Sequence, residues 1–188
     1  DGVVNGCPSH LLEPSRLQLI QYSEAFDNAY WSKSGLLTPT SGFVSPSGDL
    51  SAFKLVEDSS NSRHYINSPN IAVSAVNHST SIYIKANGRT KFALSEEVAT
   101  GIYASFDIEN GIVLDESGVS ANIKQLSNGW FRCEYTMTSG TFFQLRIVIL
   151  PDSYVSGSVS ASYQGDGTSG VYIFGVQIEQ GSFPTSYI

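Results

Sequence analysis

The chain has 188 residues, a length that suits one domain. Charged residues make up only 14% of it, against roughly 25% in an average globular domain, and its formal net charge is −7. A nucleic-acid-binding surface needs concentrated Lys and Arg, and no cluster of basic residues exceeds two neighbours, so we exclude nucleic acid as a partner. No apolar run approaches the roughly 20 residues of a membrane-spanning helix, so we expect no membrane insertion.

Strand patterns dominate the chain from its first third to its end. Residues 1–16 have no clear period and carry two prolines, which predicts an extended arm or linker before a domain over residues 17–188. That domain opens with an alternating segment at residues 17–23. Further strand patterns follow at residues 51–58, 63–68, 80–96, 102–116, 120–138, 141–150, 158–164 and 170–179. We expect roughly eleven or twelve short strands and no convincing helix.

Three Asn-Gly pairs punctuate these strands, at Asn87-Gly88, Asn110-Gly111 and Asn128-Gly129. Asn-Gly is a strong signal for a two-residue hairpin, because both turn positions want a positive φ. Hairpins pair strands antiparallel, and this many short strands close most naturally as two packed sheets. We therefore predict an all-β fold, an antiparallel two-sheet jelly-roll sandwich.

The glycine-rich stretch "GDGTSG" at residues 165–170 raises the question of a binding loop. A phosphate-binding loop needs a Lys and a following helix, whereas this stretch has no Lys and leads into a strand. We predict a hairpin between the last two strands, in which the glycines supply positive φ and Asp166 caps backbone donors. A calcium or sugar contact through Asp166 is the alternative.

Catalytic and zinc chemistry find no support in the sequence. There is no Gly-x-Ser-x-Gly nucleophile elbow. The acids Asp107, Glu109, Asp115 and Glu116 are best interpreted as a solvated hairpin. We therefore expect that the chain is not an enzyme. The three histidines are scattered and no CxxC motif exists, which argues against zinc. Whether Cys7 and Cys133 form a disulfide is left open.

Three segments together resemble a known family. "LLEPSRLQLIQYSEAFDNAYW", "SNGWFRCEYT" and "YQGDGTSGVYIFGVQIEQGSFPTSYI" are similar to signatures of domains found in bacteriophage tail, fibre and head-decoration proteins and in some bacterial polysaccharide-degrading enzymes. The resemblance runs from about Leu11 to Ile188. Gln18 stands where the family pattern usually has Asn, and Phe174 where it usually has Trp, which weakens a sugar-binding role at position 174.

The resemblance implies a domain like the carbohydrate-binding modules with a galactose-binding-like jelly roll. It implies a non-catalytic virion part for attachment or display, whose partners are cell-surface glycans or other virion proteins. A homo-oligomer such as a trimer is expected, because phage fibres and decorations are usually symmetric. The alternative is a carbohydrate-binding module of a secreted bacterial polysaccharide lyase or hydrolase, so the location would be the virion or the secreted fraction.

Sugar rings stack on flat aromatic side chains while polar groups bind the hydroxyls. Trp130 follows an Asn-Gly turn and shares a strand face with Arg132, whereas the opposite face is more apolar. Trp130 and Arg132 form a platform if that apolar face points inward, and the reverse assignment buries Trp130. Tyr65 and Tyr103 are the other candidate carbohydrate-binding residues.

Jelly-roll carbohydrate modules often hold one structural calcium where the first and last strands meet, and the resemblance extends this expectation to the chain. Glu24 follows the first predicted strand and Glu179 ends the last one. Calcium prefers six to eight hard oxygen ligands, including carboxylates and carbonyls. We therefore predict Glu24 and Glu179 as calcium ligands, provided that these two strands pair.

Overall fold

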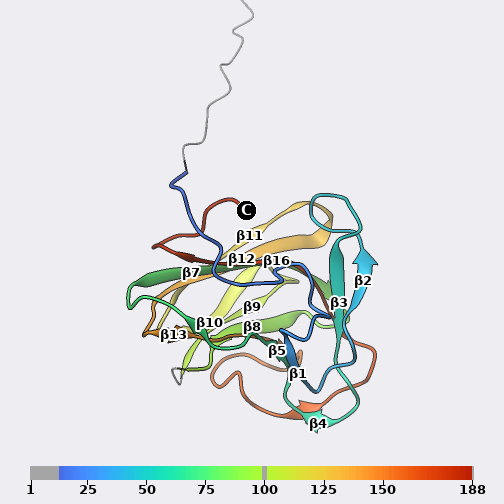
Figure 1. The fold of residues 1–188 in the computed structure, drawn as a ribbon. Coiled ribbons are helices and arrows are strands. Elements are labelled where there is room, and N and C mark those ends of the chain that lie inside the picture. The colour runs from blue at the N-terminus through green and yellow to red at the C-terminus, as the bar shows by residue number, and fades with distance from the viewer. Residues whose placement is uncertain (1–12, 99–100, 188) are drawn as a thin grey trace, which may run out of the picture.

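The computed structural model describes residues 13–98 and 101–187, and they form a two-layer antiparallel β-sandwich (Figure 1), which confirms the predicted fold class. The first sheet has the order β1-β5-β14-β8-β9-β10 and the second the order β11-β12-β7-β16-β3-β2. Two small strand pairs, β13-β6 and β15-β4, flank them. Within the described ranges, no helix is long and apolar enough to cross a bilayer.

The strands of the first sheet are β1 (Ser32–Ser34), β5 (His64–Asn67), β14 (Leu145–Leu150), β8 (Lys91–Glu96), β9 (Ile102–Asp107) and β10 (Ile112–Ser117). Those of the second are β11 (Ser120–Gln125), β12 (Trp130–Thr138), β7 (Asn77–Asn87), β16 (Gly170–Gln180), β3 (Ala52–Val56) and β2 (Thr40–Phe43). The small pairs join β13 (Phe142–Phe143) to β6 (Ile71–Ala72) and β15 (Tyr163–Gln164) to β4 (Asn61–Ser62). One short 3₁₀ turn, Ser127–Gly129, precedes β12.

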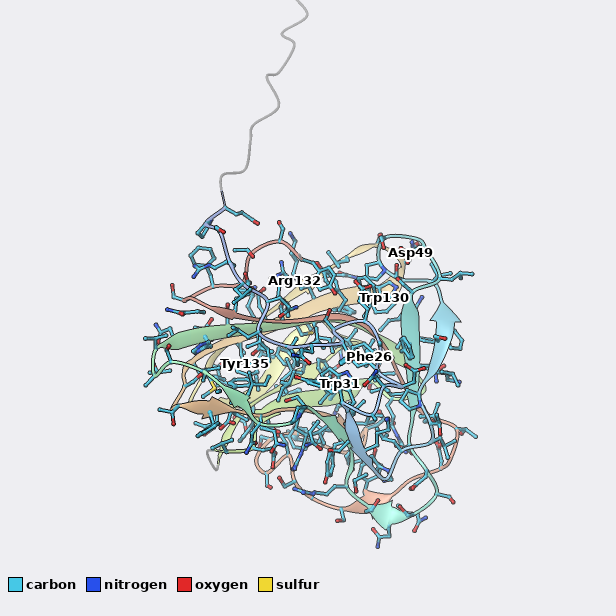
Figure 2. The ribbon with its side chains drawn as sticks, viewed as in Figure 1. Phe26, Trp31, Asp49, Trp130, Arg132 and Tyr135 are labelled. Atoms are coloured by element: carbon cyan, nitrogen blue, oxygen red, sulfur yellow. The ribbon has the colours of Figure 1, made fainter. Side chains whose placement is uncertain are left out.

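The main core lies between the two sheets and follows the period-two alternation of the strands. On β12, Phe131, Cys133 and Tyr135 point into this core. Figure 2 shows Tyr135, Phe26 and Trp31 between the layers. Phe26 and Trp31 are fully buried, although they come from the turn segment before β1 and not from a strand.

Two of the three Asn-Gly pairs sit in hairpins, as predicted. Asn110-Gly111 joins the paired strands β9 and β10, and Asn128-Gly129 joins β11 and β12. Only at Asn128-Gly129 do both residues have positive φ, of 58° and 77°. The prediction for Asn87-Gly88 was wrong, because β7 and β8 belong to different sheets. This pair turns the chain from one layer to the other, and Gly88 forms a bridge with Gly170.

The predicted first strand at residues 17–23 is also wrong. The amide side chain of Gln18 there replaces part of the backbone hydrogen bonding that a strand would form. The Gln18 amide donates to the Val176 carbonyl at 2.9 Å and accepts from the Ile178 N–H at 2.8 Å. Backbone bonds from Leu19 to Ile178 and from Val176 to Ser23 flank it. The segment therefore lies along β16 without being a strand.

The segments at the two ends of the described chain hold each other over the second sheet (Figure 1). The Glu13 carboxylate accepts bonds of 2.9 Å from the N–H and the hydroxyl of Ser186. Arg16 donates to the Gln180 carbonyl, and its guanidinium lies 5.4 Å from the centre of the Phe183 ring. Residues 181–187 therefore cover part of the outer face of the second sheet.

The glycine-rich loop is not a hairpin, which corrects the prediction, because β15 pairs with β4 while β16 pairs with β3 and β7. Close packing explains two of its glycines. A Cβ on Gly165 would lie 2.0 Å from the Asp58 carbonyl oxygen, and one on Gly170 would lie 1.8 Å from that of Leu55. Gly167 alone of the three has a positive φ, +74°. The Asp166 carboxylate caps the turn by accepting the Thr168 and Ser169 N–H groups, as predicted.

A buried carboxylate, Glu57, ties this loop to four other segments. Its side chain is 0% exposed and accepts two bonds from Arg89, of 3.0 and 2.5 Å. It also accepts the Tyr163 hydroxyl at 2.6 Å and the Asp166 N–H at 2.8 Å. Arg89 continues to Asp152 at 3.0 Å. These contacts join the end of β3, the β7–β8 crossover, the segment after β14, β15 and the glycine-rich loop.

We expect Glu57→Gln to lower the free energy of unfolding by about 2–4 kcal/mol, because it leaves buried donors without their charged acceptor. Urea unfolding followed by tryptophan fluorescence measures this. Glu109→Gln is the control, since Glu109 is exposed on the β9–β10 turn, and a change under about 0.5 kcal/mol is expected there. Equal effects of the two substitutions would refute the assigned role of Glu57.

The same variant has a predicted pH signature. Burial alone would raise the Glu57 pKa, but the hydrogen bonds it accepts outweigh burial and hold its pKa below the ordinary 4.5. The stabilisation by ionised Glu57 is therefore complete above pH 4.5 and is lost as the pH falls through the lowered pKa. The stability difference between wild type and Glu57→Gln should be constant near neutral pH and shrink under acid. Parallel stability curves down to acid pH would contradict this.

Gly170→Ala should destabilise the fold by about 3 kcal/mol or more, because the added methyl group meets a backbone carbonyl that cannot move without distorting β3. Gly140→Ala is the matched control, since a Cβ there meets nothing within 4 Å. Melting temperatures of the two variants compare the sites directly. A Gly170→Ala protein as stable as the Gly140→Ala protein would show that the β3–β16 contact is looser than described.

Candidate functional site

The predicted sugar-binding residues divide between the two outer faces of the sandwich. Tyr65 and Tyr103 lie on the outer face of the first sheet, beside the segment 151–160. Trp130 and Arg132 lie on the outer face of the second sheet, as Figure 2 shows. The four residues therefore do not form one site.

A cleft of about 260 Å³ opens on the outer face of the first sheet. The ends of β8 and β9 form one side of it, and the segment after β14 forms the other. Its lining combines one aromatic ring, two carboxylates and several serine hydroxyls, from Ser95, Glu96, Glu97, Gly101, Ile102, Tyr103, Ser158, Val159 and Ser160. Tyr103 is the one candidate residue from the sequence that lines this cleft.

Tyr103 is held in place by an acid on the neighbouring strand. Its hydroxyl donates to Asp115 at 2.9 Å, and the Gly157 N–H donates to the same carboxylate at 2.7 Å. Burial and the Asp115 contact raise the Tyr103 pKa to about 12, so the phenol stays neutral at physiological pH. Asp115 thus fixes both the ring at the cleft floor and the loop that forms its wall, and it is not the merely solvated acid that was predicted.

The cleft wall is anchored along its length. Val159 is buried against Ala93, Val148 and Leu150 on the sheet. The Tyr154 hydroxyl donates to the Gly157 carbonyl at 2.8 Å. At the start of the wall, Asp152 accepts a hydrogen bond from Arg89, which also binds Glu57. The buried Glu57 cluster therefore also positions the cleft.

Arg146 lies one strand away from the cleft, in register with Ser95 and Tyr103. Its guanidinium stacks 4.0 Å from the centre of the Tyr65 ring and lies 2.7 Å from Glu97. Arg63 lies 5.1 Å from the same ring. Two guanidinium groups therefore contact Tyr65, and Arg146 orients the cleft carboxylate Glu97.

Sequence reasoning missed Arg146, Glu97 and the serines of the wall. Arg146 had a visible signal, because it is the one charge in the otherwise apolar segment "LRIVIL". The Arg146 residue is 8% exposed, and burial lowers its pKa. A charge that remains in a buried strand marks a position with a specific partner.

Trp130 is only 1% exposed although it lies on the outer face of its sheet. The ring packs with Phe174 and Ala52 in a separate apolar cluster outside the main core. Arg132 contacts the last segment, donating to the Thr185 carbonyl and, at 3.2 Å, to the Ser81 hydroxyl. Trp130 thus has no open ring face, and Arg132 holds the segment that covers the sheet.

Glu179 belongs to β16, whereas Glu24 lies in the segment before β1, and the two have different neighbours. Glu179 is fully buried and accepts the Thr185 N–H at 2.8 Å and the Thr185 hydroxyl at 2.6 Å. Glu24 is exposed beside Tyr187, whose pKa is raised by burial and then by this carboxylate. Within residues 13–98 and 101–187, no group of three or more His, Cys, Asp or Glu side chains gathers as metal ligands would. Cys133 is buried and unpaired, whereas Cys7 lies outside the described residues.

Comparison with models of known protein families and with curated proteins finds no match. Among solved structures, the chain is similar to TmCBM61 in complex with β-1,4-galactotriose, with a TM-score of 0.50 and 9% identity over 88% of this chain and 99% of that one. It is also similar to the K1 cleaved adhesin domain of Lys-gingipain from Porphyromonas gingivalis W83, with a TM-score of 0.47 and 12% identity over 90% and 99% of the two chains. Because the identity to TmCBM61 is only 9%, this likeness establishes the fold alone, a β-sandwich like that of a carbohydrate-binding module.

Calcium at Glu24 and Glu179 stays a prediction, and it requires Glu179 to exchange its bonds to Thr185 for a metal. A cation that binds only the folded chain stabilises it, by about 2.7 kcal/mol at a hundredfold excess over its dissociation constant. We expect a higher melting temperature in millimolar calcium than in chelator, and no such difference in Glu179→Gln. Equal melting temperatures of the wild type in calcium and chelator would remove the idea.

Proposed function

We propose that the chain is a non-catalytic module that binds a glycan in the cleft of the first sheet. The observation that carries this proposal is the composition of the cleft, in which the Tyr103 ring is bordered by hydroxyls and by the oriented carboxylate of Glu97. Sugar sites combine such a ring with a few placed polar groups. The likeness to TmCBM61 supports the proposal at the level of the fold.

In this proposal a pyranose ring lays its C–H face on Tyr103. Its hydroxyls donate to Glu97 and exchange hydrogen bonds with Ser95 and Ser160. The bond from Tyr103 to Asp115 fixes the ring before the ligand arrives, so little side-chain freedom is lost on binding.

The absence of catalysis is part of the proposal. The two carboxylates at the cleft are already engaged by neighbouring donors. Glu96 accepts the N–H groups of Val98 and Gln144 at 2.9 Å each, and Glu97 lies against Arg146 and accepts the Ser95 hydroxyl. A glycoside hydrolase instead needs a proton donor and a second carboxylate that act on opposite sides of the scissile bond.

The biological setting proposed is a bacteriophage virion, as part of a tail fibre or head decoration that binds cell-surface glycans or neighbouring virion proteins as a homo-oligomer. The resemblance of the quoted sequence segments supports this setting. The second candidate is a module of a secreted bacterial polysaccharide lyase or hydrolase, which the same resemblance includes. Capsid or portal genes beside the coding sequence favour the first, and a stable trimer by light scattering agrees with it.

A glycan array followed by calorimetry on the best ligand tests the function. We expect Tyr103→Ala and Glu97→Gln each to weaken binding about tenfold or more, because they remove the stacking ring and a charge-assisted acceptor. Tyr103→Phe keeps the ring and should retain most of the affinity. Phe183→Ala, which removes an exposed aromatic ring from the segment that covers the second sheet, is the control.

The proposal fails if the array shows no ligand, or if the cleft variants bind as well as the wild type while remaining folded. Thermal melting of each variant shows whether it is folded. Turnover of a bound polysaccharide would instead make the chain an enzyme.

A further inference from the structure

A second surface, on the outer face of the other sheet, combines an aromatic pair with free positive charge. Tyr172 of β16 lies directly between Lys54 of β3 and Lys85 of β7 in the strand register. Side chains opposite one another on neighbouring strands have Cβ atoms about 5 Å apart. The phenol ring is therefore flanked by a lysine on each side, beyond the part of the sheet that residues 181–187 cover.

Phe43 of β2 completes an aromatic platform with Tyr172. The two ring centres are 5.0 Å apart with an interplanar angle of 50°. With Val44 and Lys85 they line a hollow of about 170 Å³. Both rings are partly exposed and rest on the cluster that contains buried Trp130. This gives the platform a packed base and an open upper side.

The side chain of Lys85 passes close to the β11–β12 turn. Gly129 has a positive φ of +77°, and a Cβ at that position would lie 3.6 Å from Lys85 Cε. The aliphatic stem of Lys85 therefore runs beside the turn, and the residue lines the hollow.

The charges of Lys54 and Lys85 are not used by the fold. Neither side chain forms an ion pair or a hydrogen bond with the described residues. By contrast, Lys33 and Lys91 donate to backbone carbonyls. Asp49, the acid of the β2–β3 turn, accepts hydroxyls from Ser45 and Ser51. In a chain of net charge −7, two unpartnered lysines beside a ring platform fit an anionic ligand.

We propose that Phe43, Tyr172, Lys54 and Lys85 form a binding site for an acidic sugar residue. The C–H face of the pyranose stacks on the two rings, and its acidic group, a carboxylate or a sulfate ester, lies between the two ammonium groups. That the ligand is a glycan rests on the proposed function, but the site itself is separate from the cleft of the first sheet. This site would select sugars that carry a negative charge, whereas the cleft is proposed to bind the hydroxyl groups of a sugar.

Calorimetry with two matched probes tests the site. Oligogalacturonate carries free carboxylates, and its fully methyl-esterified form has the same sugar backbone without the charge. We expect the acid form to bind and the ester to bind about tenfold more weakly or not at all, with affinity falling as salt rises. Dextran sulfate against dextran shows whether a sulfate ester serves as well as a carboxylate.

Three variants locate the binding. Tyr172→Ala and Lys85→Gln should each weaken oligogalacturonate binding about fivefold or more. Lys124→Gln removes the same charge from the same sheet but does not flank Tyr172, and should change binding less than twofold. Tyr172→Phe keeps the aromatic ring and should keep the affinity. Comparing it with Tyr172→Ala separates loss of stacking from loss of folding.

Three results overturn the proposal: no binding of either anionic probe, equal binding of acid and ester, or equal loss in Lys124→Gln and Lys85→Gln. Binding of poly-L-glutamate as tightly as oligogalacturonate, unaffected by Tyr172→Ala, would show bare charge attraction or an acidic peptide partner instead. The cleft variant Tyr103→Ala keeps the two proposals distinct. Acid-sugar binding lost in Tyr103→Ala but kept in Tyr172→Ala leaves the glycan function standing and removes the second site.

Discussion

The burial of the Glu57 carboxylate is the constraint on which the arrangement of the loops depends. A carboxylate with no solvent contact is tolerated only when several donors surround it, and here Arg89, Tyr163 and the Asp166 amide supply them. Arg89 and Asp166 belong to connections between strands, and Tyr163 belongs to the short strand β15. The same charge therefore fixes the glycine-rich loop, the crossover between the sheets and, through Asp152, the wall of the cleft.

Much of the fold could be predicted because the strands alternate and the turns have strong local signals. Both Asn110-Gly111 and Asn128-Gly129 lie in hairpins. Asn87-Gly88 has the same local sequence but turns the chain between layers, since a dipeptide specifies a bend and not the partner of the strand that follows. The glycine-rich loop misled for a related reason, because Gly165 and Gly170 are required by long-range contacts with other backbones.

The candidate site was much less accessible to sequence reasoning. Tyr103 was selected as an aromatic residue, but Ser160 of the cleft lining and Arg146, which contacts Glu97, come from distant segments that meet only in the folded sandwich. Trp130 illustrates the opposite case. The alternation of β12 left two orientations of its ring open. In the structure the ring lies outside the main core, where packing against Phe174 buries it, and no periodicity in one strand reports the cover supplied by another.

The contacts between the two end segments of the described chain have a mechanical consequence. Tension applied to both ends of the chain acts first on the bonds from Glu13 to Ser186 and from Arg16 to Gln180, and then on the Gln18 amide that lies along β16. All of these contacts belong to the second sheet and its covering segments. While these contacts hold, the force passes between the end segments and β16. The first sheet, which carries the cleft, is loaded only after they break, because the N-terminal segment continues into β1.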